Sequence, residues 1–228
     1  MNAISRLAPA LMLAALTGGA QAAPFTLVIR DQHSAALADA VVSLTPVTGA
    51  TKATTATTAT IDQRGLRFVP GVLAVQAGTA VSFPNSDQVR HHVYSFSPAK
   101  RFELRLYKDT PTEPLVFDVP GVATIGCNIH DWMIAYVVVV DTPHFASTTA
   151  EGRARIDVPE GDYDLRIWHA RNRDAEATET PMPERVHIGA AGFTRDVALV
   201  VDPPAAEPAQ SELEQKFRRF QKTPGDGT

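Results

Sequence analysis

Residues 68–87 read FVPGVLAVQAGTAVSFPNSD, with two short apolar segments, VLAVQ and AVSF, enclosed by Pro, Gly and Asn. Short segments that are rich in β-branched or aromatic residues and end at turn residues are typical of β-strands. The pattern recurs along the chain, in FTLVIRD (25–31), VVSL (41–44), RFELRLY (101–107), YVVVVD (136–141) and DLRIW (164–168). The sequence therefore predicts an all-β fold built of β-sandwiches.

Two of these strands carry further information. Apolar and charged residues alternate strictly from Arg101 to Leu106, which predicts a strand with one face in solvent. The segment from Tyr136 is continuously apolar and predicts a strand buried on both faces. Only SELEQKFRRFQK, near the C-terminus, has helical character.

Polar stretches divide the chain into segments. Residues 24–46 hold two strands around a turn, and residues 47–60, a Thr/Ala tract, are predicted to be a linker. Residues 61–142 form a compact β segment and residues 143–202 another. A polar tail with one short helix is expected over residues 203–228.

The N-terminus has the layout of a secretory signal peptide. Arg6 precedes an apolar run that is too short to span a bilayer, and small residues ending at Ala22 follow it. We expect residues 1–22 to be removed, with cleavage after Ala22 or Ala23, and the product to be exported to the periplasm. No other apolar stretch approaches the length of a membrane span, and a formal net charge of −4 gives no general attraction to nucleic acid.

The single cysteine lies in GCNIHDWM, residues 126–133. An exported thiol without an internal disulfide partner calls for another occupant. Cys127, His130 and Met133 offer a thiolate, an imidazole and a thioether, and copper accepts all three, whereas zinc seldom binds methionine. A blue-copper site also needs a second histidine, and the adjacent pair His91 and His92 offers two candidates.

Together these stretches resemble the cupredoxin family, the electron carriers similar to plastocyanin and amicyanin. The resemblance covers roughly residues 61–142. Upstream of the cysteine it rests on Phe68, Pro70, Leu73, Val75, Gly78, Val81, Phe83, Asn85, Asp87, Phe117, Pro120 and Gly121.

The resemblance implies a Greek-key β-sandwich that binds one copper ion through His91, Cys127, His130 and Met133. His91 lies six residues after Asn85, at the family's ligand position, and His92 should point to the opposite face of its strand. Arg90 and Asp131 depart from the prolines that relatives often carry, which affects the reduction potential and the docking surface.

The family likeness further implies a carrier of single electrons that turns over no substrate. Its partners would be redox proteins, a dehydrogenase or a cytochrome, because the chain also resembles plastocyanin-like methylamine-utilisation proteins. In relatives the histidine at the place of His130 lies in an apolar surface patch. Trp132 is either part of that patch or a core aromatic.

The flanks resemble a different family, the small transthyretin-like or carboxypeptidase-regulatory-like sandwich. Residues 24–46 look like its first two strands, and its continuation follows residue 143, on Thr148, Gly152, Pro159, Gly161, Tyr163 and Leu165. We therefore expect the copper domain to be inserted into one discontinuous sandwich of residues 24–46 and 143–202, with Phe25–Arg30 in the same sandwich as Tyr163–Trp168 and the copper loop apart from it. The alternative is a cupredoxin whose sheets are extended by both flanks.

Other functions use the same residues differently. A protein that stores or delivers copper would bind the metal through the same four side chains but exchange it readily. A non-catalytic structural module would need no metal. A thiol hydrolase built on Cys127 lacks a recognisable nucleophile turn or helix N-terminus to activate the thiol.

Overall fold

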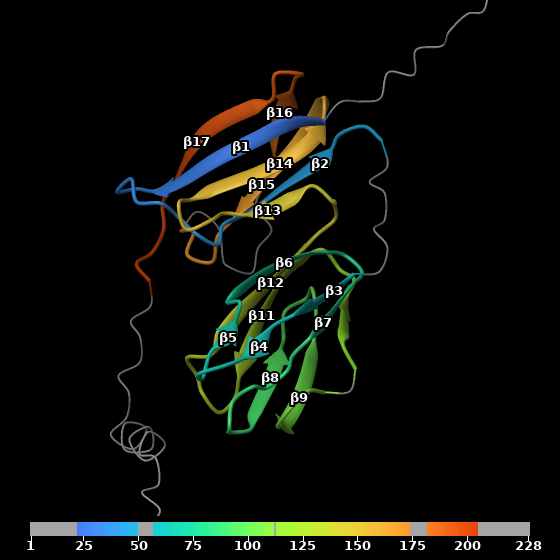
Figure 1. Cartoon of the computed structure of the whole chain (residues 1–228), viewed down its shortest axis with the longest axis vertical. Coiled ribbons are helices and arrows are strands. Elements are labelled where there is room, and N and C mark those ends of the chain that lie inside the picture. Colours follow the sequence, from blue (N-terminus) through green and yellow to red (C-terminus); the bar gives the residue numbers. More distant parts are fainter. Residues whose placement is uncertain (1–21, 50–56, 112, 174–181, 205–228) are drawn as a thin grey trace, which may run out of the picture.

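The computed structural model describes residues 22–49, 57–111, 113–173 and 182–204, and every regular element in these ranges is a β-strand (Figure 1). The predicted all-β fold is confirmed. Residues 1–21 of the predicted signal peptide, the middle of the expected linker and the expected C-terminal helix lie outside the described residues. Within the described ranges, no helix has the length and apolar character needed to cross a membrane.

The middle of the chain forms one sandwich, here called the central sandwich. Its larger sheet has the order β6-β12-β11-β8-β9, with bounds Val72–Gln76, Ile134–Val140, Gly121–Cys127, His91–Ser95 and Phe102–Tyr107. The smaller sheet has the order β10-β7-β3, formed by Leu115–Phe117, Thr79–Ser82 and Thr58–Thr60. A short ribbon pairs β4 (Asp62–Gln63) with β5 (Phe68–Val69). The core of the central sandwich includes Phe83, Phe117, Ile125 and Val137.

Strands from both flanks form a second sandwich, the flanking sandwich. One sheet has the order β14-β1-β17, with bounds Arg153–Pro159, Ala22–Asp31 and Phe193–Leu199. The other has the order β13-β2-β15-β16, with bounds Phe145–Ser147, Val41–Pro46, Gly161–Trp168 and Glu184–Ile188. Phe25 and Leu27 of β1 share one hydrophobic core with Tyr163 and Leu165 of β15. The strands β1 and β15 thus contribute to one core from different sheets.

The expected linker at residues 47–60 is wrong at its C-terminal end. Residues Thr58–Thr60 are β3, which pairs in parallel with β7, and the Thr57 and Thr79 hydroxyls lie 2.7 Å apart. A threonine-rich segment without large apolar side chains can still form an edge strand, because its backbone bonds to a neighbour and threonine suits a pleated sheet.

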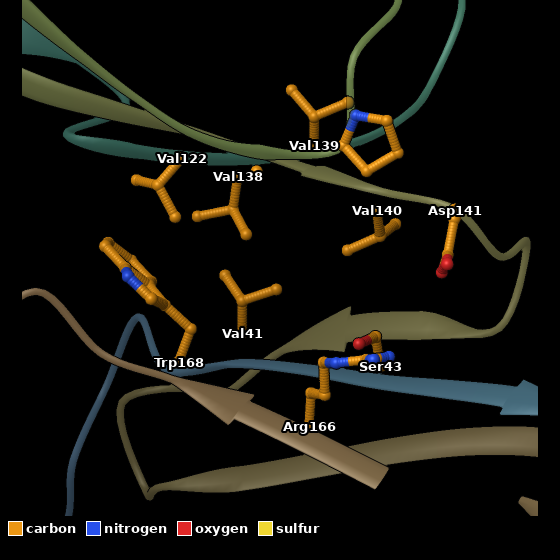
Figure 2. A pocket seen from close by; sticks show the side chains of 11 residues that line it. Val41, Ser43, Val122, Val138, Val139, Val140, Asp141, Arg166 and Trp168 are labelled. Carbon is orange, nitrogen blue, oxygen red and sulfur yellow. The ribbon is translucent and has the colours of Figure 1, made fainter. Parts of the chain in front are cut away.

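Strand β12 is buried on both faces, as predicted, because it belongs to two cores. Val137 and Val139 face the centre of the central sandwich, and Val138 and Val140 face the flanking sandwich. There they meet Trp168, whose ring lies 5.3 Å from that of Tyr136. Figure 2 shows this junction, where valines from both sandwiches and Trp168 line a cavity of about 180 Å³.

Candidate metal centre

Two adjacent strands bring the distant site residues together. His91 opens β8 and Cys127 ends β11, and these strands pair antiparallel, with Cys127 opposite Val93. Beyond Cys127 the backbone N–H of Asn128 donates to the carbonyl of His92 at 3.1 Å. The loop between β11 and β12 is thereby fixed to the strand that carries the histidine.

The loop itself is closed by two backbone hydrogen bonds. The N–H of Met133 donates to the carbonyl of His130 at 2.8 Å, and the N–H of Cys127 donates to that of Met133 at 3.2 Å. Three of the four predicted ligand residues therefore lie in one short, hydrogen-bonded turn at the end of the larger sheet.

Cys127, His91 and His130 converge on one point. The Cys127 Sγ lies 3.7 Å from Nδ1 of His91 and 3.9 Å from Nδ1 of His130. One ligand atom from each residue lies within 4.8 Å of the other two. His91 is 0% exposed, Cys127 is 2% exposed and His130 is half-buried, so the cluster is closed on the inside and reaches the surface at His130.

These separations fit a metal ion between the three atoms. With ligand distances of about 2.0–2.1 Å to nitrogen and about 2.3 Å to sulfur, an angle of about 120° at the metal separates sulfur and nitrogen by about 3.8 Å. The two measured sulfur–nitrogen distances lie on either side of this value. One thiolate and two imidazoles are the donor set that blue-copper sites use.

Met133 lies beside the cluster. It is 1% exposed and packs in the same core as Cys127. The thioether as a fourth ligand stays a prediction.

The surroundings of Cys127 favour the thiolate. Burial raises the pKa of the thiol, but a hydrogen bond from His91, the backbone N–H groups of Ile129 and His92, and a contact from His130 outweigh it and lower the pKa to about 6. A thiol that is ionised at neutral pH binds a metal without first losing a proton.

The structure separates the two candidate histidines. His92 points away from the cluster, and its Nε2 lies 3.0 Å from Oε1 of Glu103, at an angle that does not make a hydrogen bond. The backbone N–H of His92, by contrast, faces Cys127 and donates a hydrogen bond to its sulfur. The alternation of side chains along β8 accounts for this division.

Sequence reasoning missed the partner of His91. The Nε2 of His91 lies 3.0 Å from Oδ2 of Asp87. Asp87 was matched as part of the family pattern, and its spacing of four residues before His91 was the available signal. Sequence spacing alone does not show that this carboxylate contacts the ring of the candidate ligand His91.

The exposed edge of the site carries an aromatic side chain. The ring of Trp132 lies 5.2 Å from that of His130, and Trp132 is 40% exposed, which places it on the surface. The neighbouring residues Ile129 and Ile134 are also exposed, and so is the charged Asp131 between them.

Fold and site together define an all-β protein with a buried Cys–His₂ cluster suited to a metal ion. No protein-family model and no curated protein matches the sequence. The chain is similar to a purple cupredoxin from Nitrosopumilus maritimus, with 24% identity and a TM-score of 0.33 over 36% of this chain and 99% of that one. It is also similar to a Cu(I) form of an amicyanin variant, with 21% identity and a TM-score of 0.33 over 36% of this chain and 82% of that one.

A copper-containing nitrite reductase from Thermus scotoductus matches at 25% identity and a TM-score of 0.35, over 42% of this chain and 25% of the reductase. All three TM-scores lie below 0.5. The functional interpretation therefore rests on the geometry of the cluster.

Proposed function

We propose that this protein is a periplasmic copper protein that binds one copper ion and carries single electrons between redox partners. The observation that carries the proposal is the convergence of Cys127, His91 and His130 at separations suited to a trigonal metal site. Bound copper would supply the one-electron couple between Cu(II) and Cu(I). The chain itself turns over no substrate in this proposal.

The protein's own residues supply rigidity and a route to the surface. His91 is fixed between Cys127 and Asp87, and backbone hydrogen bonds hold the loop of Cys127 and His130. A site whose ligands are already in place needs little rearrangement when its charge changes. The half-buried His130 beside Trp132 offers the shortest way out for an electron, toward a redox protein such as a dehydrogenase or a cytochrome.

The visible spectrum of the protein with Cu(II) tests this proposal. We expect a strong sulfur-to-copper charge-transfer band that disappears in Cys127→Ser and weakens or shifts in His91→Gln. His92→Gln is the matched control, because its side chain lies outside the cluster, and it should keep the band. A wild-type protein without the band would refute the proposed site.

Storage or delivery of copper is the second candidate, because the partial exposure of His130 also allows a ligand exchange. Voltammetry and competition with a chelator separate the two functions. Reversible one-electron exchange with tightly held metal supports the carrier, and rapid loss of copper to the chelator supports the store.

A further inference from the structure

We propose that Asp87 is a positioning residue of the copper site, which fixes the tautomer of His91 and joins the two ligand segments. The inference rests on the proposed function, because it assigns a role toward the same metal. It arises from a chain of contacts that runs from His91 through Asp87 and the loop at residues 64–67 to Trp132 and His130.

The carboxylate of Asp87 is occupied on both oxygens. Oδ1 accepts the N–H of Gly65 at 2.6 Å, and Oδ2 accepts the N–H of Leu66 at 3.0 Å and contacts Nε2 of His91 at 3.0 Å. The side chain of Asp87 is only 12% exposed. The backbone of Asp87 is fixed as well, because its N–H donates to Oδ1 of Asn85 at 3.0 Å.

This arrangement selects one form of the imidazole. An ionised carboxylate only accepts hydrogen bonds, so Nε2 of His91 carries the proton. When Nδ1, the nitrogen that faces Cys127, binds a metal through its lone pair, the ring is thus neutral with its proton on Nε2, whereas without a metal Nδ1–H donates to the sulfur. A carboxylate behind a ligand histidine fixes the ring orientation and raises the basicity of the ligand nitrogen.

The loop that binds the carboxylate has an unusual backbone. Gly65 and Leu66 both have positive φ, 62° and 59°, and the N–H of Arg64 bonds to the carbonyl of Arg67. Two successive left-handed residues direct adjacent N–H groups to one side, where they make a small anion-binding concavity. A left-handed conformation is uncommon for a residue such as leucine and persists where surrounding contacts hold it.

Leu66 extends the connection to the other ligand segment. Its carbonyl accepts the Nε1–H of Trp132 at 3.2 Å, and Trp132 contacts the ring of His130. Leu66 thus touches Asp87 through its N–H and Trp132 through its carbonyl. The His91 segment and the Cys127–His130 loop are therefore linked by hydrogen bonds outside the metal cluster itself.

The negative charge behind His91 should also distinguish the two oxidation states. A carboxylate favours the ion of higher positive charge, so Asp87 should strengthen the binding of Cu(II) more than that of Cu(I). A purely structural hydrogen bond would strengthen both equally.

The test compares Asp87→Asn with the wild type as full-length protein, using chelator competition to measure the affinities for Cu(II) and Cu(I). Asparagine keeps an oxygen for His91 and Leu66, loses the acceptor for Gly65 and removes the charge. We expect the Cu(II) affinity to fall about 10–100-fold and the Cu(I) affinity to fall less. Asp118→Asn is the matched control, because it removes an exposed charge of the central sandwich that lies outside the ligand segments, and it should leave the ratio of the two affinities within about twofold of the wild type.

Equal losses for both ions, or none, would overturn the proposal. Nitrogen NMR of the metal-free wild type provides a measurement that does not depend on the folding of a variant, with a proton expected on Nε2 of His91. An Nε2 without a proton would refute the role of Asp87. If the wild type bound no copper at all, the proposed function would fail, whereas the tautomer would still report on the contact between Asp87 and His91.

Discussion

Lowering the pH of the metal-free protein should protonate Cys127 far below the usual pH for a thiol. The hydrogen bonds to the sulfur lower its pKa from 9.0 to about 6 although burial acts in the opposite direction. This difference corresponds to about 4 kcal/mol in favour of the thiolate. At pH 7 about 90% of the protein should carry the thiolate, compared with about 1% for a thiol of ordinary pKa.

The direction of the pH effect follows from the lowered pKa. The stabilisation of the folded state by the thiolate is fully present above the pKa of the unfolded thiol and is lost as the pH falls through about 6. His91 contributes in the opposite direction, because its contacts with Cys127 and Asp87 outweigh burial and raise its pKa. The two groups are in contact and titrate together, so the measured midpoint belongs to the pair.

The ultraviolet absorbance of the thiolate, followed against pH with Cys127→Ser as the baseline, measures this midpoint. We expect it near pH 6. The functional consequence is metal affinity, since an ordinary thiol would lose about 100-fold at pH 7 to competition from the proton. A midpoint above pH 8 would show that the hydrogen bonds do not overcome burial, and the preformed thiolate would have to be abandoned.

Three substitutions test other parts of the structure. Met133→Leu conserves volume in a buried position, so it should lower the free energy of unfolding in urea by less than about 1.5 kcal/mol. If the thioether is a ligand, the substitution should shift the charge-transfer band of the copper-bound protein. An unchanged spectrum would remove Met133 from the ligand set. Gly152→Ala places a Cβ 2.3 Å from the carbonyl oxygen of Ile29 at a φ of +74°, and it should lower the unfolding free energy by at least about 2 kcal/mol without changing that spectrum. Trp168→Ala should lower the free energy of unfolding by about 3–5 kcal/mol, because it empties the junction between the sandwiches, and it should leave the charge-transfer band unaltered. A loss of copper binding in Gly152→Ala or Trp168→Ala would contradict the separation of the site from the flanking sandwich.

The strand pattern of the sequence predicted much of the fold, but the alternation in RFELRLY did not predict which side chains at the end of the strand face the core. Phe102 and Leu104 are partly buried as expected, but Leu106 is 54% exposed and Tyr107 takes the inner position. Pairing with β8 matches Val93 to Leu104 and His91 to Tyr107, so β9 contains one extra residue there. Such a bulge exchanges the two faces of a strand, and sequence alternation alone does not reveal it.

Spacing in the sequence predicted the residues of the candidate site but not the contacts that hold them in place. Cys127, His130 and Met133 lie within seven residues in the sequence, and a count from Asn85 selected His91 over its neighbour. The contacts of Asp87 span more than twenty residues and depend on the left-handed backbone at Leu66. No propensity of leucine predicts that conformation, because tertiary contacts maintain it.

Strands β11 and β12 explain how one chain combines a buried site with a large neighbouring sandwich. Val122 and Val138 pair with each other near the end of these strands that is away from the ligand loop, and they pack against the flanking sandwich. Cys127 and Met133 lie at the opposite end, where the loop joins the two strands. Five residue steps of extended strand, about 17 Å, separate Val122 from Cys127, and three steps, about 10 Å, separate Met133 from Tyr136, whose ring contacts Trp168. The contacts with the flanking sandwich and the ligand loop therefore lie toward opposite ends of β11 and β12, and Figure 1 shows the flanking sandwich beyond one end of the central sandwich. A substitution confined to the core of the flanking sandwich should therefore leave the ligand loop in place.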